Sequence, residues 1–537
     1  MKYLLAFDTS GDEIILVAAQ LLVGGSTGKV LIESSLQAKR AANTQLLTLI
    51  DAALASADIT RDQLGAIAVG TTLGSYTGVR IGVAAAKGIA QALAIPLYGL
   101  ELDPGNLNPQ QLLSNFTQAQ AFQSGYPSAV LPQYTRMSYA EEAEQKQHPQ
   151  RYPADDAHIT IPFHSEQDPI IPERSEESSA PQHPQLLLGI ETSCDETAVA
   201  LMSGTDLLSN VIASQVVFHA RFGGVVPEIA SRKHSEAIVA TVDEAIRQAG
   251  VSLTDLTGIA VTDRPGLIGA LVVGHAYAKA LGWALQIPVY GINHLEGHLY
   301  ACALDGTDLP VPHVTLIVSG GHTTLVHCPR PFEYETMGET LDDAAGEAFD
   351  KVAKVLGLGY PGGPILSKLA ESGNPHAIDF PRAMLHSKDY AFSLSGLKTA
   401  VITYIREAEQ AGQALNIPDI AASFQQAVVD VQVAKAVRAV QETDVKHFIL
   451  AGGVAANKVL RTALTEALAD IDVEVLISPL EYCGDNAAMI VRAAVARLQT
   501  NELACKTPSA EYALNSYLQP LPLTADASST GSLDTSL

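Results

Sequence analysis

Residues 92–100 read ALAIPLYGL, and residues 284–292 read ALQIPVYGI, at an offset of 192 residues. The same offset relates further identical residues: Ile67-Ala68-Val69 to Ile259-Ala260-Val261, and Lys87 to Lys279. An ungapped match over roughly 40 residues indicates a duplicated domain, because shared composition alone does not keep residues in register.

The first copy, residues 1–103, has the pattern of a compact α/β unit. Apolar runs predict strands at Leu4–Phe7, Ile14–Val17, Leu64–Val69 and Ile95–Leu100, and helical periodicity predicts helices at 43–54 and 78–93. The polar turn Asp8–Ser10 after the first strand corresponds to Glu191–Ser193 in the second copy.

Between the copies, residues 104–185 are rich in Gln, Pro, Ser and Glu, which predicts a flexible linker with a possible ordered island at 131–136. Residues 186–518 are predicted to form a larger α/β domain with lobes at about 186–312 and 313–518. Residues 519–537 are expected to be a disordered tail.

Three predicted strands of this larger domain each run into a polar or glycine-rich turn. They are Leu186–Ile190, Val314–Val318 and Phe448–Ala451. Backbone N–H groups exposed at such turns bind phosphate or adenosine, and glycine lets the ligand approach the backbone. Three such turns predict a nucleotide site between two lobes.

His294 and His298 are four residues apart, so in a helix both imidazoles lie on one face and can reach one metal ion. Glu296 points away from that face, which distinguishes the stretch from the metalloprotease motif H-E-x-x-H. Two ordinary histidines at a strand-to-helix junction remain the alternative. The first copy has Leu102 and Asn106 at the corresponding positions, so we expect it to bind no metal.

Composition limits the classes of function. The chain has 537 residues, enough for two or more domains, and a net charge of −25, which argues against a generic nucleic-acid binder. Its five cysteines form no C-x-x-C pair, and no run of 18 apolar residues occurs. We therefore expect a soluble cytoplasmic protein without disulfides that does not act at a membrane.

Five motifs carry a family resemblance: 189–197 (GIETSCDET), 293–298 (NHLEGH), 318–323 (VSGGHT), 342–351 (DDAAGEAFDK) and 451–457 (AGGVAAN). Together they resemble TsaD, the bacterial tRNA threonylcarbamoyltransferase family. The resemblance implies an α/β fold of duplicated ribonuclease-H-like domains, as in actin, Hsp70 and sugar kinases. Residues 1–103 resemble the N-terminal lobe of the catalytically silent TsaB family, and 131–136 resembles a TsaB segment near its C-terminus. The chain therefore resembles a TsaB–TsaD fusion with a shortened TsaB part.

The resemblance also implies a reaction. The threonylcarbamoyl group would pass from threonylcarbamoyl-AMP to N6 of the adenosine 3′ of the anticodon, in tRNAs that read ANN codons. The implied partners are tRNA, a separate TsaE-type ATPase and a TsaC-type adenylate synthase, with the TsaB partner supplied in cis. One divalent metal is implied per catalytic domain, iron first, with zinc or magnesium as alternatives.

Site residues follow from the same resemblance. The implied metal ligands are His294, His298 and Asp485. The implied substrate-binding residues are Ile317, Val318, Ser319, Gly320, Gly321, Asp350, Gly363 and Asn457. Asp195 and Glu196 are the candidate catalytic carboxylates, and a role in capping the adjacent turn is an equal alternative for both.

Three further expectations concern Arg264, the packing of the two copies and the contacts with tRNA. Arg264 stands where TsaD relatives usually have glycine, so it either strains the turn or marks a relaxed one. The helix at 43–54 is expected to pack against the helix around 236–246 across a pseudo-two-fold axis. The basic residues nearest the motifs are candidates for tRNA contact: Arg221, Arg232, Lys233, Arg382, Lys388 and Lys398. A chaperone- or kinase-like ATPase of the same superfold is the alternative function, although such proteins hold nucleotide through Mg²⁺ and carboxylates.

Overall fold

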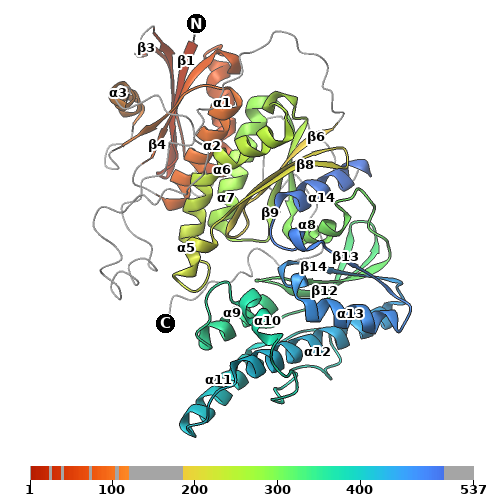
Figure 1. The fold of residues 1–537 in the computed structure, drawn as a ribbon. Helices are drawn as coiled ribbons and strands as arrows, with labels where there is room; N and C mark the ends of the chain where they lie inside the picture. The colour runs from red at the N-terminus through yellow and green to blue at the C-terminus, as the bar shows by residue number, and fades with distance from the viewer. Residues whose placement is uncertain are drawn as a thin grey trace.

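The computed structural model describes residues 2–22, 27–37, 42–71, 75–102, 108–119 and 185–500 (Figure 1). The island at 131–136, most of the predicted linker and the tail at 519–537 lie outside these ranges. The described strands form three sheets of five strands each.

All three sheets have the same strand order. The first is β3 (Thr27–Gln37), β2 (Glu13–Leu21), β1 (Lys2–Asp8), β4 (Leu64–Gly70) and β5 (Leu97–Leu100). The second is β8 (Asp206–Ser214), β7 (Glu196–Ser203), β6 (Leu186–Glu191), β9 (Gly258–Arg264) and β10 (Val289–Asn293). The third is β13 (Glu333–Glu339), β12 (Thr323–Arg330), β11 (His313–Val318), β14 (His447–Ala451) and β15 (Glu474–Ile477). In each sheet the first three strands are antiparallel and the last two pair in parallel, so the predicted ribonuclease-H-like α/β class is confirmed.

Helices cover these sheets. In the N-terminal unit they are α1 (Ala42–Ser56), α2 (Tyr76–Ala92) and α3 (Pro109–Ala119). In the middle unit they are α5 (Val216–Ala220), α6 (Pro227–Ala249), α7 (Ile268–Leu285) and α8 (His294–Tyr300). The remainder are α9 (Ala345–Val355), α10 (Gly362–Ala370), α11 (Ser395–Gln410), α12 (Ile417–Thr443), α13 (Lys458–Ala469) and α14 (Ala487–Gln499).

The sequence repeat is also a structural repeat. Ile67 pairs with Leu97 in the first sheet, and Ile259 pairs with Val289 in the second, at the same offset of 192 residues. A methyl group on Gly82 would collide with the hydroxyl of Thr9, and one on the equivalent Gly274 with that of Thr192. The two copies therefore share strand register and helix–turn packing.

The two copies pack through α2 and α7, not through the expected contact of 43–54 with 236–246. A glycine lets α2 and α7 approach closely, because a Cβ on Gly88 of α2 would lie 2.7 Å from the Tyr277 carbonyl oxygen of α7. Hydrogen bonds flank the helix pair on both sides. Gln91 Nε2 donates to Asp243 Oδ1 at 2.7 Å, and Trp283 Nε1 donates to Asp51 Oδ1 at 2.8 Å. These two bonds are again related by the offset of 192 residues.

Two elements of the N-terminal unit differ from the sequence-based prediction. The range predicted as linker contains α3, whose Leu112 and Phe116 are buried on the sheet face opposite α1 and α2. The Phe116 ring meets Tyr98 edge-on, with ring centroids 5.0 Å apart. The edge strand β3 was not predicted, because most of its side chains are exposed or half-buried and lack a strict apolar alternation.

The last helix crosses back to the middle unit. α14 follows the third sheet in sequence but packs on the second, so residues 313–500 are not one separate lobe (Figure 1). Gly189 of β6 permits this approach, because a Cβ there would lie 2.7 Å from the Ala487 carbonyl oxygen. The crossing brings the segment before α14 next to α8.

Of the helices in the described ranges, α7 alone is long and apolar enough to cross a membrane. It is 72% buried within the protein, where it packs on α2, α6 and β9. Its apolar character is that of a core helix.

Candidate metal centre and substrate site

α8 begins where β10 ends, and Asn293 caps it by accepting hydrogen bonds from Leu295 N and Glu296 N at 2.8 and 3.3 Å. His294 and His298 therefore lie one turn apart, with ring centroids separated by 4.6 Å. Both side chains are buried. A Cβ on Gly297 would lie 2.7 Å from the Ile490 side chain, which shows how closely α8 packs on α14.

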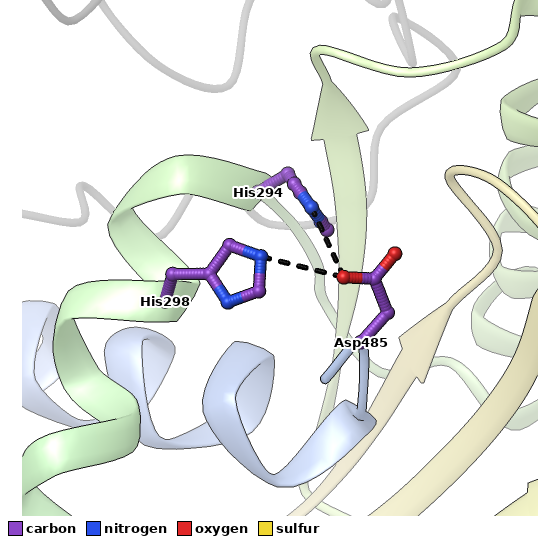
Figure 2. Close-up of side chains that lie close together, drawn as sticks. All are labelled: His294, His298 and Asp485. Atoms are coloured by element: carbon purple, nitrogen blue, oxygen red, sulfur yellow. Dashed lines mark ion pairs between the residues drawn. The ribbon is translucent and has the colours of Figure 1, made fainter. Parts of the chain in front are cut away.

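Asp485 lies in the segment before α14 and faces both histidines (Figure 2). Its Oδ1 is 3.3 Å from His298 Nε2 and 3.5 Å from His294 Nε2, and one ligand atom from each residue lies within 4.8 Å of the others. Neither buried ring nitrogen of His298 has a hydrogen-bond partner of good geometry. A divalent metal ion would bind one of these nitrogens, Nε2, which faces Asp485, so the residues present fit such an ion.

The charges of the group depend on one another. Burial opposes the charge on His294, but Asp485 and Glu191 outweigh it and raise the pKa of His294 to about 9. Burial lowers the pKa of His298. Burial also opposes the charge of Asp485, but the two histidines hold the pKa of Asp485 well below its usual range. The site thus favours a positive charge, which a metal cation supplies in place of a proton.

Glu191 orients His294 from the side away from Asp485. The Glu191 carboxylate is fully buried, lies 3.2 Å from His294 Nδ1, and accepts hydrogen bonds from Ser193 N and Thr262 Oγ1. A carboxylate on the second ring nitrogen fixes the orientation of a metal-binding histidine. This role of Glu191 was not predicted from sequence, where the available signal was its correspondence to Asp8, which likewise accepts a hydrogen bond from Ser10 N.

Glu296 faces away from the metal group, as predicted. It is fully buried and ion-paired with Arg497 of α14, with an Nε to Oε1 distance of 2.9 Å, and it accepts a hydrogen bond from Tyr334 at 3.0 Å. This pair ties the histidine helix to α14 and to the third sheet.

Asp195 lies in the turn after β6, and Glu196 is the first residue of β7. Glu196 accepts a hydrogen bond from Ser214 Oγ at 3.0 Å, and burial, together with Asp195 and Asp485, raises the pKa of Glu196 to about 9. Burial, with a smaller contribution from Asp195, also raises the pKa of Asp350. Asp195 is thus close enough to raise the pKa of two carboxyl groups, Glu196 of β7 and Asp350 of α9. Glu191 makes the turn-capping hydrogen bond to Ser193.

The turn after β11, residues 319–322, exposes its backbone where a ligand could bind. Ile317 and Val318 are fully buried, so their side chains do not face a ligand. Ser319 Oγ accepts a hydrogen bond from His322 N at 3.1 Å, and a Cβ on Gly320 or Gly321 would meet no atom within 4 Å. Burial, together with the charges of His294 and His298, lowers the pKa of His322 to about 4. The effect of these two charges places His322, and with it this turn, beside the metal group.

Asp350 and Gly363 are joined directly, since Asp350 Oδ1 accepts hydrogen bonds from Gly362 N at 2.8 Å and Gly363 N at 3.0 Å. Asn457 caps α13 through Leu460 N, and its Nδ2 donates to Ser367 Oγ and Gln425 Oε1. Both polar atoms of the Asn457 side chain are therefore engaged in holding α10, α12 and α13 together.

Arg264 introduces no left-handed strain. It is the last residue of β9, it is not among the described residues with positive φ, and its guanidinium pairs with Asp263 at 2.5 Å. The turn after β9 packs on the turn after β6, since a Cβ on Gly266 would lie 2.7 Å from the Ser193 carbonyl oxygen. Of the two alternatives, the turn without strain is the one observed.

Fold and site together define a class: a ribonuclease-H-like α/β protein in which the second and third sheets meet at a His/His/Asp group. The profile of TsaD, described as tRNA N6-adenosine threonylcarbamoyltransferase, matches residues 35–102 and 206–492. The chain belongs to the TsaD family. The predicted function and enzyme class are thereby confirmed at the level of the family.

Curated relatives agree with this assignment. The tRNA N6-adenosine threonylcarbamoyltransferase of Moorella thermoacetica is 55% identical over 305 residues, which are 57% of this chain and 89% of that protein. The Bacillus subtilis protein of the same name is 53% identical over 314 residues, 58% of this chain and 90% of that protein. The N-terminal unit lies largely outside these matches.

Solved structures are more distant. Component A of the Acidaminococcus fermentans (R)-2-hydroxyglutaryl-CoA dehydratase gives a TM-score of 0.37 at 15% identity, over 59% of this chain and 99% of that one. T. kodakarensis HypF gives 0.42 at 14% identity, over 60% of this chain and 50% of that one. We draw no functional argument from similarities of this size.

Proposed function

We propose that this protein transfers a threonylcarbamoyl group from threonylcarbamoyl-AMP to N6 of the adenosine 3′ of the anticodon in tRNAs that read ANN codons. The observation that carries the proposal is the group of buried His294 and His298 with half-buried Asp485, in a chain of the TsaD family. Because the substrate is tRNA, we place the reaction in the cytoplasm.

In this proposal His294, His298 and Asp485 hold one divalent metal ion, with iron as the first candidate and zinc or magnesium as alternatives. When bound, the ion would polarise the carbamoyl oxygen and offset negative charge as AMP leaves. Glu191 holds the His294 ring so that Nε2 faces the ion. Two histidines and one carboxylate leave open positions for substrate.

The other candidate site residues would bind the adenylate and accept the proton of the attacking amine. The open backbone at Ser319–Gly321 suits the adenylate phosphate, because small residues let it approach N–H groups. Asp350 fixes the first turn of α10 at Gly362–Gly363, which would contact the adenosine part. Of the two candidate catalytic carboxylates, Asp195 and Glu196, Asp195 would accept the amine proton, because Glu196, with its pKa raised to about 9, already carries a proton near neutral pH.

The N-terminal unit is proposed to be a TsaB-like partner supplied in cis. Its support is the repeat itself, with interface hydrogen bonds that recur at the offset of 192 residues. This unit is proposed to be catalytically silent, because Leu102 stands where the second copy has His294. A TsaC-type synthase would supply the adenylate, and a TsaE-type ATPase would act as a separate partner.

The test is nucleoside mass spectrometry of tRNA from a strain that depends on this gene. Replacing the gene by the His298→Ala form should abolish N6-threonylcarbamoyladenosine and leave other modified nucleosides unchanged. A normal amount of that nucleoside in the His298→Ala strain would refute the proposal.

A further inference from the structure

Two aromatic rings with cations over them lie beside the candidate catalytic turn. Lys233 Nζ lies 4.3 Å from the centroid of the Phe218 ring, and the Arg221 guanidinium lies 4.8 Å from that of Phe222. Both rings are half-buried and Arg221 is exposed. Directly before Phe218 in sequence, Val217 is 81% exposed, the highest value among the exposed large apolar side chains of the described chain.

This segment is rigidly attached to the catalytic turn. Gln215, the residue before α5, donates its backbone N–H to the Asp195 carbonyl oxygen at 3.0 Å. Its buried side chain contacts His219 Nε2 at 3.2 Å and His234 Nδ1 at 3.3 Å, and His234 Nε2 lies 3.0 Å from the Cys194 carbonyl oxygen. Buried polar contacts thus hold the inner face of α5 in place, while Val217 on its outer face is exposed to solvent.

The segment of residues 215–223 also approaches α9, one of the helices that follow the third sheet's first three strands in sequence. A Cβ on Gly223 would lie 3.2 Å from Nζ of Lys354, an exposed residue of α9. By contrast, acidic partners hold three of the basic residues considered from sequence: Lys233 with Glu236, Arg382 with Asp430 and Lys398 with Asp343. Lys233 keeps its place over the Phe218 ring despite that partner.

We propose that Val217, Phe218, Arg221, Phe222, Lys233 and Lys354 form the surface that receives the single-stranded loop around the target adenosine. Single-stranded RNA is bound by aromatic and guanidinium faces that stack on bases, with cations along the backbone. A base must leave its stack before an enzyme can act on it, and an exposed apolar side chain can take the place of the lost neighbour. The inference rests on the proposed function, which supplies the nucleic acid.

The experiment uses the full chain and an anticodon stem-loop RNA with 2-aminopurine at the target position, whose fluorescence rises when the base is unstacked. The Val217→Ser/Phe222→Leu variant should raise Kd for this RNA about tenfold and should reduce the fluorescence rise. Val217→Ser alone changes only an exposed side chain and should reduce the fluorescence rise with folding intact. Val30→Ser, at a 37% exposed valine of β3, is the matched control and should leave both readings unchanged.

Wild-type Kd and fluorescence in the double variant would overturn the inference. So would a loss seen only when a second protein is added, because the surface would then serve a protein partner. The wild-type chain could transfer nothing to tRNA while the double variant still lost RNA binding. That result would support the RNA-binding surface and refute the proposed reaction.

Discussion

Lys87 and Lys279 occupy equivalent positions of the repeat and make the same hydrogen bond in opposite directions across the α2–α7 interface. Lys87 Nζ donates to the Ser235 carbonyl oxygen, and Lys279 Nζ donates to that of Asn43. Each acceptor is offset from the other by the same 192 residues. The contact between the copies is therefore isologous within one chain, as in a two-fold dimer.

Close helix contact at this interface requires a residue without a side chain. In Gly88→Ala the new Cβ would lie 2.7 Å from the Tyr277 carbonyl oxygen and 3.0 Å from Leu281 N, so the helices must separate. We expect a loss of about 1–3 kcal/mol in the free energy of unfolding, measured by denaturant titration. Gly396→Ala in α11 meets no atom within 4 Å and should be neutral or slightly stabilising. Equal effects of the two substitutions would contradict the packing.

Part of this architecture could be predicted from sequence because it is local or repeated. The offset of 192 residues fixed which segments are equivalent, and the spacing of His294 and His298 fixed their common helix face. The third candidate ligand needed the family resemblance, because nothing in the local pattern around Asp485 shows that α14 returns to the second sheet. The role of Glu191 depends on a contact with His294, and periodicity carries no information about such contacts.

Asp243 should make the stability of the interface depend on pH. Burial, opposed by the hydrogen bond from Gln91, raises the pKa of Asp243 to about 6 from 3.8. The folded chain then holds the proton to a higher pH than the unfolded chain. This contribution to stability is present below pH 3.8 and is lost as pH rises through 6.

The matching substitution is Asp243→Asn, which should raise the free energy of unfolding by about 1–2 kcal/mol at pH 8 and have little effect near pH 4. Asp51→Asn, at the equivalent position, is the contrast: it removes the 3.0 Å ion pair with Arg61 and should destabilise at pH 8. A stabilising effect of Asp243→Asn that did not change with pH would contradict the explanation.

Glu191 should act through His294 and not on substrate directly. Glu191→Gln keeps the size of the side chain but removes the charge beside His294 Nδ1, so metal affinity should fall by about 10- to 100-fold. Competition with a metal-binding dye measures this. In Glu335→Gln, which changes an exposed carboxylate paired with His327, affinity should stay the same. Unchanged metal affinity in Glu191→Gln would exclude the orienting role.

The central claim is that His294, His298 and Asp485 hold the metal ion on which transfer depends. The most direct measurement strips the purified chain of metal, returns one divalent ion at a time, and counts N6-threonylcarbamoyladenosine formed per tRNA by mass spectrometry. The account predicts no product from the stripped wild-type chain, recovery with at least one ion, and no recovery in His298→Ala with any ion. Full product formation by the stripped chain, or by His298→Ala, would contradict it.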